Sequence, residues 1–152
     1  MSFDFKTAVK LYKENPTSER LSEVAEKLLS EMTLKEKIRM MRGHAMGVTI
    51  KNVFTRGRYY NGEAYPAGGC KRLGIPPVLF TDGPRGIVMG KCTCFPVSML
   101  RGATFDDELE YEIGKVMAKE ASAFGANLYA GVCINLLRNP RWGRAQETYG
   151  ED

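Results

Sequence analysis

Two polar segments of this sequence carry the side chains best suited to bind a polar small molecule. Asp82 lies in the turn DGPRG at positions 82–86, directly after the short apolar run 78–81. The second segment, RNPRWGR at positions 138–144, holds three arginines and the single tryptophan of the chain. A carboxylate and guanidinium groups that converge would form a pocket for a hydroxyl-rich or anionic small molecule.

Each of these residues also has an ordinary structural interpretation. Asp82 could bond to backbone N–H groups of its own turn. Arg144 could be a solvated surface residue, or it could pair with Glu147 or Glu151. Trp142 could pack against other side chains instead of stacking on a sugar. The residue types alone therefore leave structural and binding roles open.

Several other chemistries do not fit the sequence. His44 is the only histidine, so Ser-His, Cys-His and two-His metal arrangements lack a partner residue. The four cysteines lie at scattered positions apart from one CxC pair at 92–94, which favours reduced thiols over a zinc site or a disulfide. The segment 86–92 departs from the phosphate-binding loop pattern, and no GxGxxG motif opens a helix after a strand. We therefore expect neither a metal nor a cofactor.

The composition is that of a soluble globular protein. Hydrophobic residues make up 43% of the chain and charged residues 26%. The net charge of +4 is small, and the basic residues of 20–42 alternate with glutamates, so we expect no nucleic-acid partner. Residues 1–15 carry spaced charges without an apolar core, and no apolar run reaches about eighteen residues. These features predict a cytoplasmic protein without membrane contact.

The first third of the chain is predicted to be helical. Residues 17–32 repeat apolar side chains at three- and four-residue steps, with Thr17 or Ser18 as the N-cap. Thr33 and Glu36 have the spacing of a capping box, which predicts a second helix that ends at Gly43. The apolar stripes are Leu21, Val24, Leu28 and Met32 in the first helix and Leu34, Ile38 and Met41 in the second. Residues 44–76 are rich in turn signals, which is typical of either a flexible segment or a functional surface loop, and we favour the functional loop.

The remaining sequence has the strand–helix–strand order of a parallel α/β fold. The run 78–81 is bounded by Pro and Gly, which predicts a strand buried on both faces. Thr104 is expected to open a helix that Gly125 ends, and 127–137 is expected to be the next strand. The apolar face of that helix is assigned to Leu109, Ile113, Val116 or Met117, and Phe124. Because ligands bind at the carboxyl ends of parallel strands, Asp82 and the arginine segment are expected at one edge.

Taken together, these segments resemble the amino-terminal barrel domain of glycoside hydrolase family three β-glucosidases. Four blocks carry the resemblance, at 31–38 (EMTLKEKI), 72–86 (RLGIPP through TDGPRG), 93–96 (TCFP) and 138–152 (RNPRWGR through GED). They follow the order and spacing of the family. The resemblance implies an α/β fold: the N-terminal part of a (β/α)8 TIM-type barrel, incomplete, with preceding helices. We divide the chain into a helical segment, 1–32, and a partial barrel domain, 33–152.

The resemblance also implies roles for particular residues. Asp82 matches the aspartate that accepts hydrogen bonds from the terminal sugar, and Arg144 matches an arginine that donates to the same sugar. Glu147 matches the glutamate that holds this arginine in place. Further contacts with the sugar are possible at Arg85, Arg138 and Trp142. Many members continue the turn as DGPxGxR, but Val88 stands where the second arginine would be, so the identity of the sugar stays open.

The resemblance implies a retaining exo-β-glycosidase that hydrolyses terminal β-D-glucosyl or related residues by double displacement. That reaction needs two carboxyl groups about 5–5.5 Å apart. The nucleophile of the family lies in an Ser-Asp-Trp-like segment, and no such segment or later Lys-His pair occurs in these 152 residues. The acid/base of the family comes from outside the barrel, and a whole barrel needs about 250 residues. We therefore assign no catalytic residue and expect the chain alone to be inactive.

The resemblance also leads to expectations about the partners of the chain and leaves one alternative for its function. Its substrate is expected to be a β-linked oligosaccharide or glycoside. Its open strand edges are expected to pair with the remainder of the enzyme or with a second copy of the chain. The alternative to part of a glycosidase is a non-catalytic carbohydrate-binding or regulatory fragment.

Overall fold

A computed structural model of the chain describes residues 3–43, 50, 54 and 62–150. The chain divides into two compact units, which we describe separately. The helical unit comprises residues 1–46 and 66–78, and the α/β unit comprises residues 47–65 and 79–152. The division into 1–32 and 33–152 stays a prediction. Within the described residues, no helix is long and apolar enough to cross a membrane.

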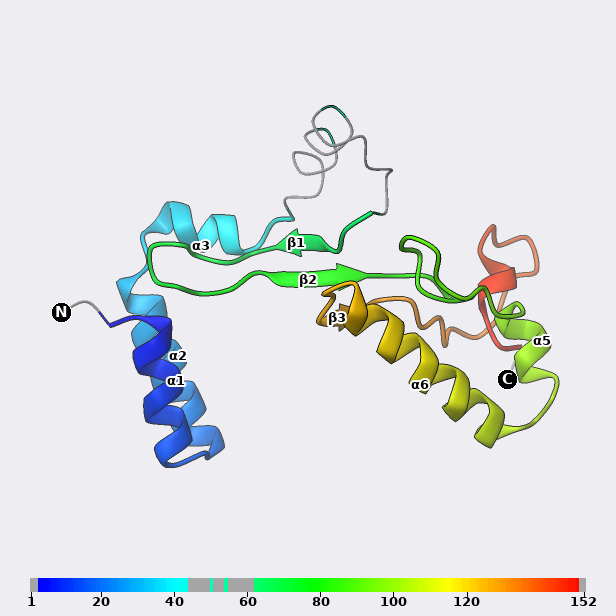
Figure 1. Cartoon of the computed structure of the whole chain (residues 1–152), viewed down its shortest axis with the longest axis horizontal. Coiled ribbons are helices and arrows are strands. Elements are labelled where there is room, and N and C mark those ends of the chain that lie inside the picture. The colour runs from blue at the N-terminus through cyan, green and yellow to red at the C-terminus, as the bar shows by residue number, and fades with distance from the viewer. Residues whose placement is uncertain (1–2, 44–49, 51–53, 55–61, 151–152) are drawn as a thin grey trace. The chain divides into compact units, whose positions relative to one another are not determined.

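The described residues of the helical unit form three helices, and each helix begins at a residue whose side chain caps it. They are α1 (Phe5–Glu14), α2 (Ser18–Glu31) and α3 (Leu34–Met40), and α1 and α2 lie side by side (Figure 1). The Thr17 hydroxyl accepts from the Arg20 N–H at 3.1 Å, which settles the N-cap of α2. The capping box is also present: Thr33 accepts from the Glu36 N–H, and the Glu36 carboxylate accepts from the Thr33 N–H at 2.9 Å.

The prediction that Leu34, Ile38 and Met41 form the buried apolar side of α3 is wrong. Leu34, Ile38 and Met41 are 73%, 54% and 81% exposed. The opposite side of α3 faces the rest of the unit, because Glu36 bonds to Arg72 and Met40 packs against the buried residues there. The small core consists of Met32, Cys70 and Leu73, with Met40 and Ile75 packed against it.

Part of the expected loop at 44–76 is ordered by backbone bonds. Residues 44–49, 51–53 and 55–61 lie outside the described residues, so the expectation stays a prediction there. In the described part, the strand β1 (Tyr65–Ala67) was not predicted. Cys70 and Ile75 then form an antiparallel bridge with N–O distances of 2.9 and 3.0 Å. Gly74 closes this turn at φ +68°, where a side chain would be strained.

The α/β unit has the predicted strand–helix–strand order. The strands β2 (Val78–Thr81) and β3 (Leu128–Tyr129) pair in parallel, and α6 (Asp107–Ala123) connects them (Figure 1). Phe80 aligns with Leu128 and Thr81 aligns with Tyr129. The sheet has the order β1-β2-β3. A short helix, α5 (Ser98–Gly102), precedes α6, and the 3-10 helix η1 (Ala145–Glu147) follows β3.

Both strand predictions need correction. The strand β2 is not buried on both faces, since Val78 is 45% exposed and only Thr81 is buried. The second strand is confined to 128–129; the Ala130 N–H still donates to the Thr81 carbonyl at 2.8 Å, and in the described part of the chain residues 131–139 belong to no strand. The reason is that an apolar pattern supplies side chains for burial, whereas a strand also needs a neighbour for its backbone N–H and C=O groups.

The helix α6 has a side-chain cap at its N-terminus and a backbone cap at its C-terminus. Its N-cap is Asp106, which accepts from the Leu109 N–H at 2.9 Å, so the expectation that Thr104 opens the helix is wrong by two residues. Gly125 at φ +78° ends the helix as predicted. The Gly125 N–H donates to the Ser122 carbonyl and the Ala126 N–H to the Ala121 carbonyl, both at 2.9 Å, which is a Schellman motif.

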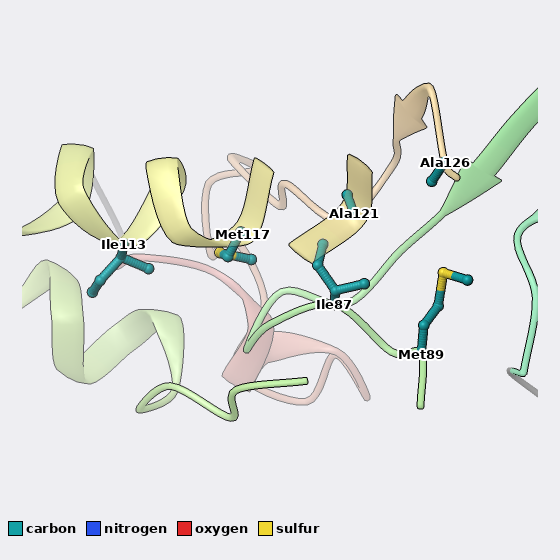
Figure 2. Packing of buried hydrophobic residues seen from close by; sticks show 6 residues of the cluster. All are labelled: Ile87, Met89, Ile113, Met117, Ala121 and Ala126. Atoms are coloured by element: carbon teal, nitrogen blue, oxygen red, sulfur yellow. The ribbon is translucent and has the colours of Figure 1, made fainter. Parts of the chain in front are cut away.

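The core of the α/β unit lies between α6 and the turn that follows β2. Figure 2 shows the residues of this cluster, with Ile87 next to Ala121 and with Met117 and Ile113 further along α6. The cluster consists of Ile87, Met89, Ile113, Met117, Ala121 and Ala126. Of the predicted apolar face of α6, Ile113 and Met117 are buried, while Leu109, Val116 and Phe124 are 38–41% exposed. This packing fixes the polar turn after β2 against the helix.

Candidate functional site

The turn that carries Asp82 is a tight backbone loop. The Val88 N–H donates to the Asp82 carbonyl at 3.1 Å, and the Gly86 N–H donates to the Gly83 carbonyl at 3.3 Å. Gly83 and Gly86 have φ of +118° and +129°, and a Cβ on Gly86 would lie 2.0 Å from the Thr93 carbonyl oxygen. Only glycine fits this position. The turn leaves the Asp82 side chain exposed at the carboxyl end of β2.

The loop at residues 93–96 contacts this turn through a backbone hydrogen bond and a side-chain contact. The Phe95 N–H donates to the Arg85 carbonyl at 2.7 Å, and Arg85 Nη2 lies 3.6 Å from the Cys94 sulfur. The loop itself is tied to α6, because the Thr93 hydroxyl and N–H donate to Glu120 Oε1 at 2.7 and 3.0 Å. The TCFP block at 93–96 therefore holds the DGPRG turn in place.

Arg144 and Glu147 form a two-bond ion pair at η1. Arg144 Nε lies 2.9 Å from Glu147 Oε1, and Nη2 lies 2.5 Å from Oε2. The short helix brings these residues together at a spacing of three. The Arg144 side chain is 66% exposed and the Glu147 side chain 19% exposed, so the carboxylate is the covered partner.

The hydrogen bonds and charges of this pair shift the pKa of both groups. The Arg144 guanidinium lowers the pKa of Glu147 by hydrogen bonding. The pKa of Arg144 is raised, chiefly by the bonds with Glu147 and to a smaller extent by Asp82. Both groups are therefore charged over the ordinary pH range.

One open cavity lies between the turn after Asp82 and the residues that follow Arg144, although neither Asp82 nor Arg144 is among its lining residues. It has a volume of about 350 Å³ and is lined by the turn residues 83–88, by Cys92, Thr93, Cys94 and Val97, and by Gln146 and Glu147. Arg85 and Val88 belong to this lining, and Val88 is 44% exposed. Arg138 and Trp142 line a different cavity of about 260 Å³ with Asn135, Leu136 and Asn139. The structure thus groups Arg85 with Glu147 and separates Arg138 and Trp142 from them.

Two residues next to this site were missed by sequence analysis. Arg101 of α5 is buried and donates to the Pro84 carbonyl at 2.7 Å. The Tyr129 hydroxyl donates to the Gly83 carbonyl at 2.6 Å, and burial raises the pKa of Tyr129 to about 12. Nothing local signals these contacts, because the partners lie 17 and 46 positions apart in the chain.

The described residues contain no group of three or more His, Cys, Asp or Glu side chains that could hold a metal ion. Cys70, Cys92, Cys94 and Cys133 are free thiols. His44 lies outside the described residues. The polar side chains that line the cavity of about 350 Å³ are Arg85, Thr93, Gln146 and Glu147, together with the thiols of Cys92 and Cys94.

Comparison with solved structures supports this arrangement as part of a known fold. The chain is similar to β-glucosidase 3B of Thermotoga neapolitana in complex with glucose, with a TM-score of 0.67, 29% identity, and coverage of 84% of this chain and 19% of that chain. It is also similar to a Kluyveromyces marxianus β-glucosidase in complex with glucose, with a TM-score of 0.62, 33% identity, and coverage of 84% and 14%.

Sequence comparison gives the same family. A probable β-glucosidase I of Aspergillus clavatus is 37% identical over 134 residues, covering 84% of this chain and 14% of that protein. A probable exo-1,4-β-xylosidase of Aspergillus oryzae is 33% identical over 146 residues, covering 84% and 16%. The chain therefore spans 14–19% of the length of these relatives.

The alignment confirms the expected fold class, a mixed α/β fragment from the N-terminal part of a barrel domain with an incomplete sheet. The family model described as the glycosyl hydrolase family 3 N terminal domain matches residues 21–152. The chain belongs to this family.

Proposed function

We propose that this chain forms part of the sugar-binding site of a retaining exo-β-glycosidase that acts on terminal β-D-glucosyl or related residues. The observation that carries the proposal is the cavity of about 350 Å³, which is lined by residues 83–88, directly after Asp82, and by Glu147, the ion-pair partner of Arg144. Family membership supports it, as do the relatives whose structures hold glucose.

The proposed roles follow from the charges of the two segments. Asp82 is exposed at the end of β2 and accepts hydrogen bonds from sugar hydroxyls, since bonds to a carboxylate are short and strong. Glu147 engages Nε and Nη2 of Arg144, and we assign the Nη1 group to the same sugar. Glu147 thus fixes the plane of the guanidinium and does not itself bind the sugar.

The remaining residues give less information about the substrate. Arg85 lines the cavity and is a further candidate donor. A contact of Arg138 or Trp142 with the substrate stays a prediction, because both line the separate cavity. Val88 presents an apolar side chain beside Asp82, and the relatives include both glucosidases and a xylosidase. We therefore propose a β-glycoside as the substrate class and leave the sugar open.

Binding of D-glucose to the purified chain tests the proposal, measured by saturation-transfer NMR. We expect a signal with the unaltered chain and its loss in Asp82→Asn and Arg144→Gln. Asp107→Asn and Arg39→Gln are matched controls, because both side chains are exposed and neither belongs to the two proposed sugar-binding segments. Unaltered binding in Asp82→Asn and Arg144→Gln, or no binding by a folded chain, would overturn the proposal.

We further propose that the 152-residue chain hydrolyses no glycoside by itself and works in the cytoplasm with the remainder of the enzyme. An aryl β-glucoside assay checks the first point, with a mock purification as the control. Release of nitrophenol above the mock level would contradict it. Sugar binding without hydrolysis, both alone and after a downstream polypeptide of the family is supplied, would instead favour the carbohydrate-binding or regulatory alternative.

A further inference from the structure

We propose that Arg101 is a positioning residue that sets the distance between the two sugar-binding segments. This inference rests on the proposed function, because it concerns the geometry of the same site. Arg101 lies in α5 and does not itself line the cavity that we assign to the sugar. Its guanidinium instead connects the turn that carries Asp82 to the segment that carries Arg144.

One side of the guanidinium holds the turn. Arg101 Nη2 donates to the Pro84 carbonyl at 2.7 Å and to the Ser98 hydroxyl at 3.0 Å. The Ser98 hydroxyl also lies 3.4 Å from the same Pro84 carbonyl. Pro84 is two residues after Asp82, so these bonds fix the backbone that directs the Asp82 carboxylate.

The other side of the guanidinium holds the second segment. Arg101 Nη1 lies 2.8 Å from Glu110 Oε1 of α6, and the Tyr149 hydroxyl donates to the same oxygen. The guanidinium carbon lies 5.3 Å from the centre of the Tyr149 ring, which is a cation–π contact. Tyr149 is two residues after Glu147, so its ring determines where the Arg144–Glu147 pair lies.

The backbone of α5 approaches this segment closely as well. A Cβ on Gly102 would lie 2.4 Å from the Tyr149 carbonyl oxygen. The helix α5 therefore packs directly on the chain after η1. A substitution at Arg101 would therefore displace both the turn that carries Asp82 and the segment around Tyr149, because α5 contacts both.

Arginine is suited to this role and other residues are not. Its planar group donates in several fixed directions and also stacks on a ring, whereas a lysine ammonium is a point charge on a flexible stem. The Arg101 side chain is 3% exposed, so no water replaces a lost bond. The Nε of Arg101 has no partner among the described residues. The bonds of Nη1 and Nη2 are therefore formed although one buried donor stays unsatisfied.

The test compares glucose affinity in Arg101→Gln, Arg101→Lys and Lys115→Gln, at a temperature where circular dichroism shows each protein to be folded. We expect the Kd for D-glucose to rise about tenfold in Arg101→Gln, because a displaced turn no longer presents Asp82 correctly. Arg101→Lys keeps a charge beside Glu110 and should recover part of the affinity. Lys115→Gln removes an exposed ion pair on α6 and should change nothing.

A milder variant keeps the test decisive if Arg101→Gln fails to fold. Ser98→Ala removes one support of the Pro84 carbonyl and should weaken glucose binding about threefold. Amide hydrogen exchange gives a readout without sugar: residues 83–88 and 145–149 should exchange faster together in either variant. A folded Arg101→Gln or Ser98→Ala protein with unaltered Kd and unaltered exchange would overturn the inference.

The outcome separates this inference from the proposed function. If Asp82→Asn abolishes glucose binding while the Arg101 and Ser98 variants bind normally, the positioning role is wrong and the sugar site stands. If the unaltered folded chain binds no glucose, the proposed function is wrong. Coupled exchange at 83–88 and 145–149 would in that case still support the connection through Arg101.

Discussion

Each unit of the chain contains one charged side chain that bonds to several separate segments, and these two side chains differ in burial. Glu36 in the helical unit accepts bonds from Thr33 at 2.9 Å and from Arg72 at 2.7 and 2.9 Å. The side chains of Glu36 and Arg72 are 22% and 48% exposed. Arg101 in the α/β unit donates to three oxygens and is 3% exposed.

The difference in exposure determines what each connection contributes. Water competes for the bonds of an exposed pair, which typically contributes less than about 1 kcal/mol. Breaking a buried pair leaves groups that water cannot reach, at a cost of about 3–5 kcal/mol. We therefore expect the α/β unit, which holds the candidate site, to tolerate fewer substitutions than the helical unit.

The largest effect is expected at the glycines of the DGPRG turn. Gly86→Ala should destabilise the α/β unit by about 3 kcal/mol, because the backbone lies at φ +129° and the new Cβ would meet a carbonyl oxygen. Gly43→Ala in the helical unit has nothing within 4 Å and should change stability by less than about 0.5 kcal/mol. Urea unfolding followed by Trp142 fluorescence and by circular dichroism measures both. Equal effects would contradict the comparison.

A smaller loss is expected where α5 meets the segment after η1. Gly102→Ala should destabilise by about 2 kcal/mol, although alanine favours helices, because its Cβ would meet the Tyr149 carbonyl. Gly114→Ala in α6 is the matched variant, with open space at its Cβ, and should stabilise by about 1 kcal/mol. Thermal unfolding separates the two. A stabilised Gly102→Ala protein would show that the close contact is absent in solution.

In the helical unit, removal of the helix cap should cost less. Thr33→Ala removes the hydroxyl that accepts from the Glu36 N–H and should cost about 1 kcal/mol. Ser30→Ala is the control, since the Ser30 hydroxyl bonds only within α2 and is exposed. The change in circular dichroism on urea titration measures each cost. A loss of more than about 3 kcal/mol in Thr33→Ala would show that this unit is as sensitive as the other.

The smallest effects are expected in the pH dependence, and they have opposite directions in the two units. Bonds from Arg72, with the Thr33 cap, hold the pKa of Glu36 well below its usual 4.5. The unfolded chain therefore binds this proton more readily, and the stabilisation is complete above pH 4.5 and is lost as the pH falls below it. Glu36→Gln should flatten the stability of the helical unit between pH 6 and pH 3. An unchanged profile would show that the bonds to Arg72 are too exposed to matter.

Tyr129 gives the opposite case in the α/β unit. Burial raises its pKa from 10.0 to about 12, so the folded state keeps the proton longer than the unfolded chain. This contribution is complete below pH 10 and is lost as the pH rises towards 12. The tyrosinate absorbance of the unaltered chain minus that of Tyr129→Phe should appear near pH 12. Its appearance near pH 10 would mean that Tyr129 is solvated.

The same contrast explains what sequence reasoning could predict. The Thr33 capping box and the end of α6 at Gly125 depend on residues close together in the chain, and both predictions are confirmed. The bounds of the strand 78–81 are confirmed as well, because turn residues flank it on both sides, whereas its burial was predicted wrongly. The stripe at Leu34, Ile38 and Met41 was wrong because periodicity does not say which side of a helix meets a partner. The strand 127–137 was too long because the pattern does not supply a hydrogen-bonding neighbour.

The candidate site shows the same limit. Short motifs suggested Asp82, Arg144 and Glu147; the structure pairs Arg144 with Glu147, and of the three only Glu147 lines the cavity. Their roles toward a sugar stay predictions. Arg101 and Tyr129 were missed because their partners are distant in sequence and because a buried arginine looks like a surface arginine in a sequence. Sequence motifs identified the groups that could touch a ligand, and the structure was needed to find those that hold them.

Asn127, at the start of β3, has a consequence for the alignment of the sheet. Its side-chain oxygen accepts from the Leu79 N–H at 2.8 Å, and its own N–H donates to the Leu79 carbonyl at 2.8 Å. A slip of one residue along β2 would lose both bonds and turn every side chain to the other face. The Asn127 carboxamide thus favours one register of β2 against β3. That register also determines at which level of the sheet the segments after Thr81 and after Tyr129 begin.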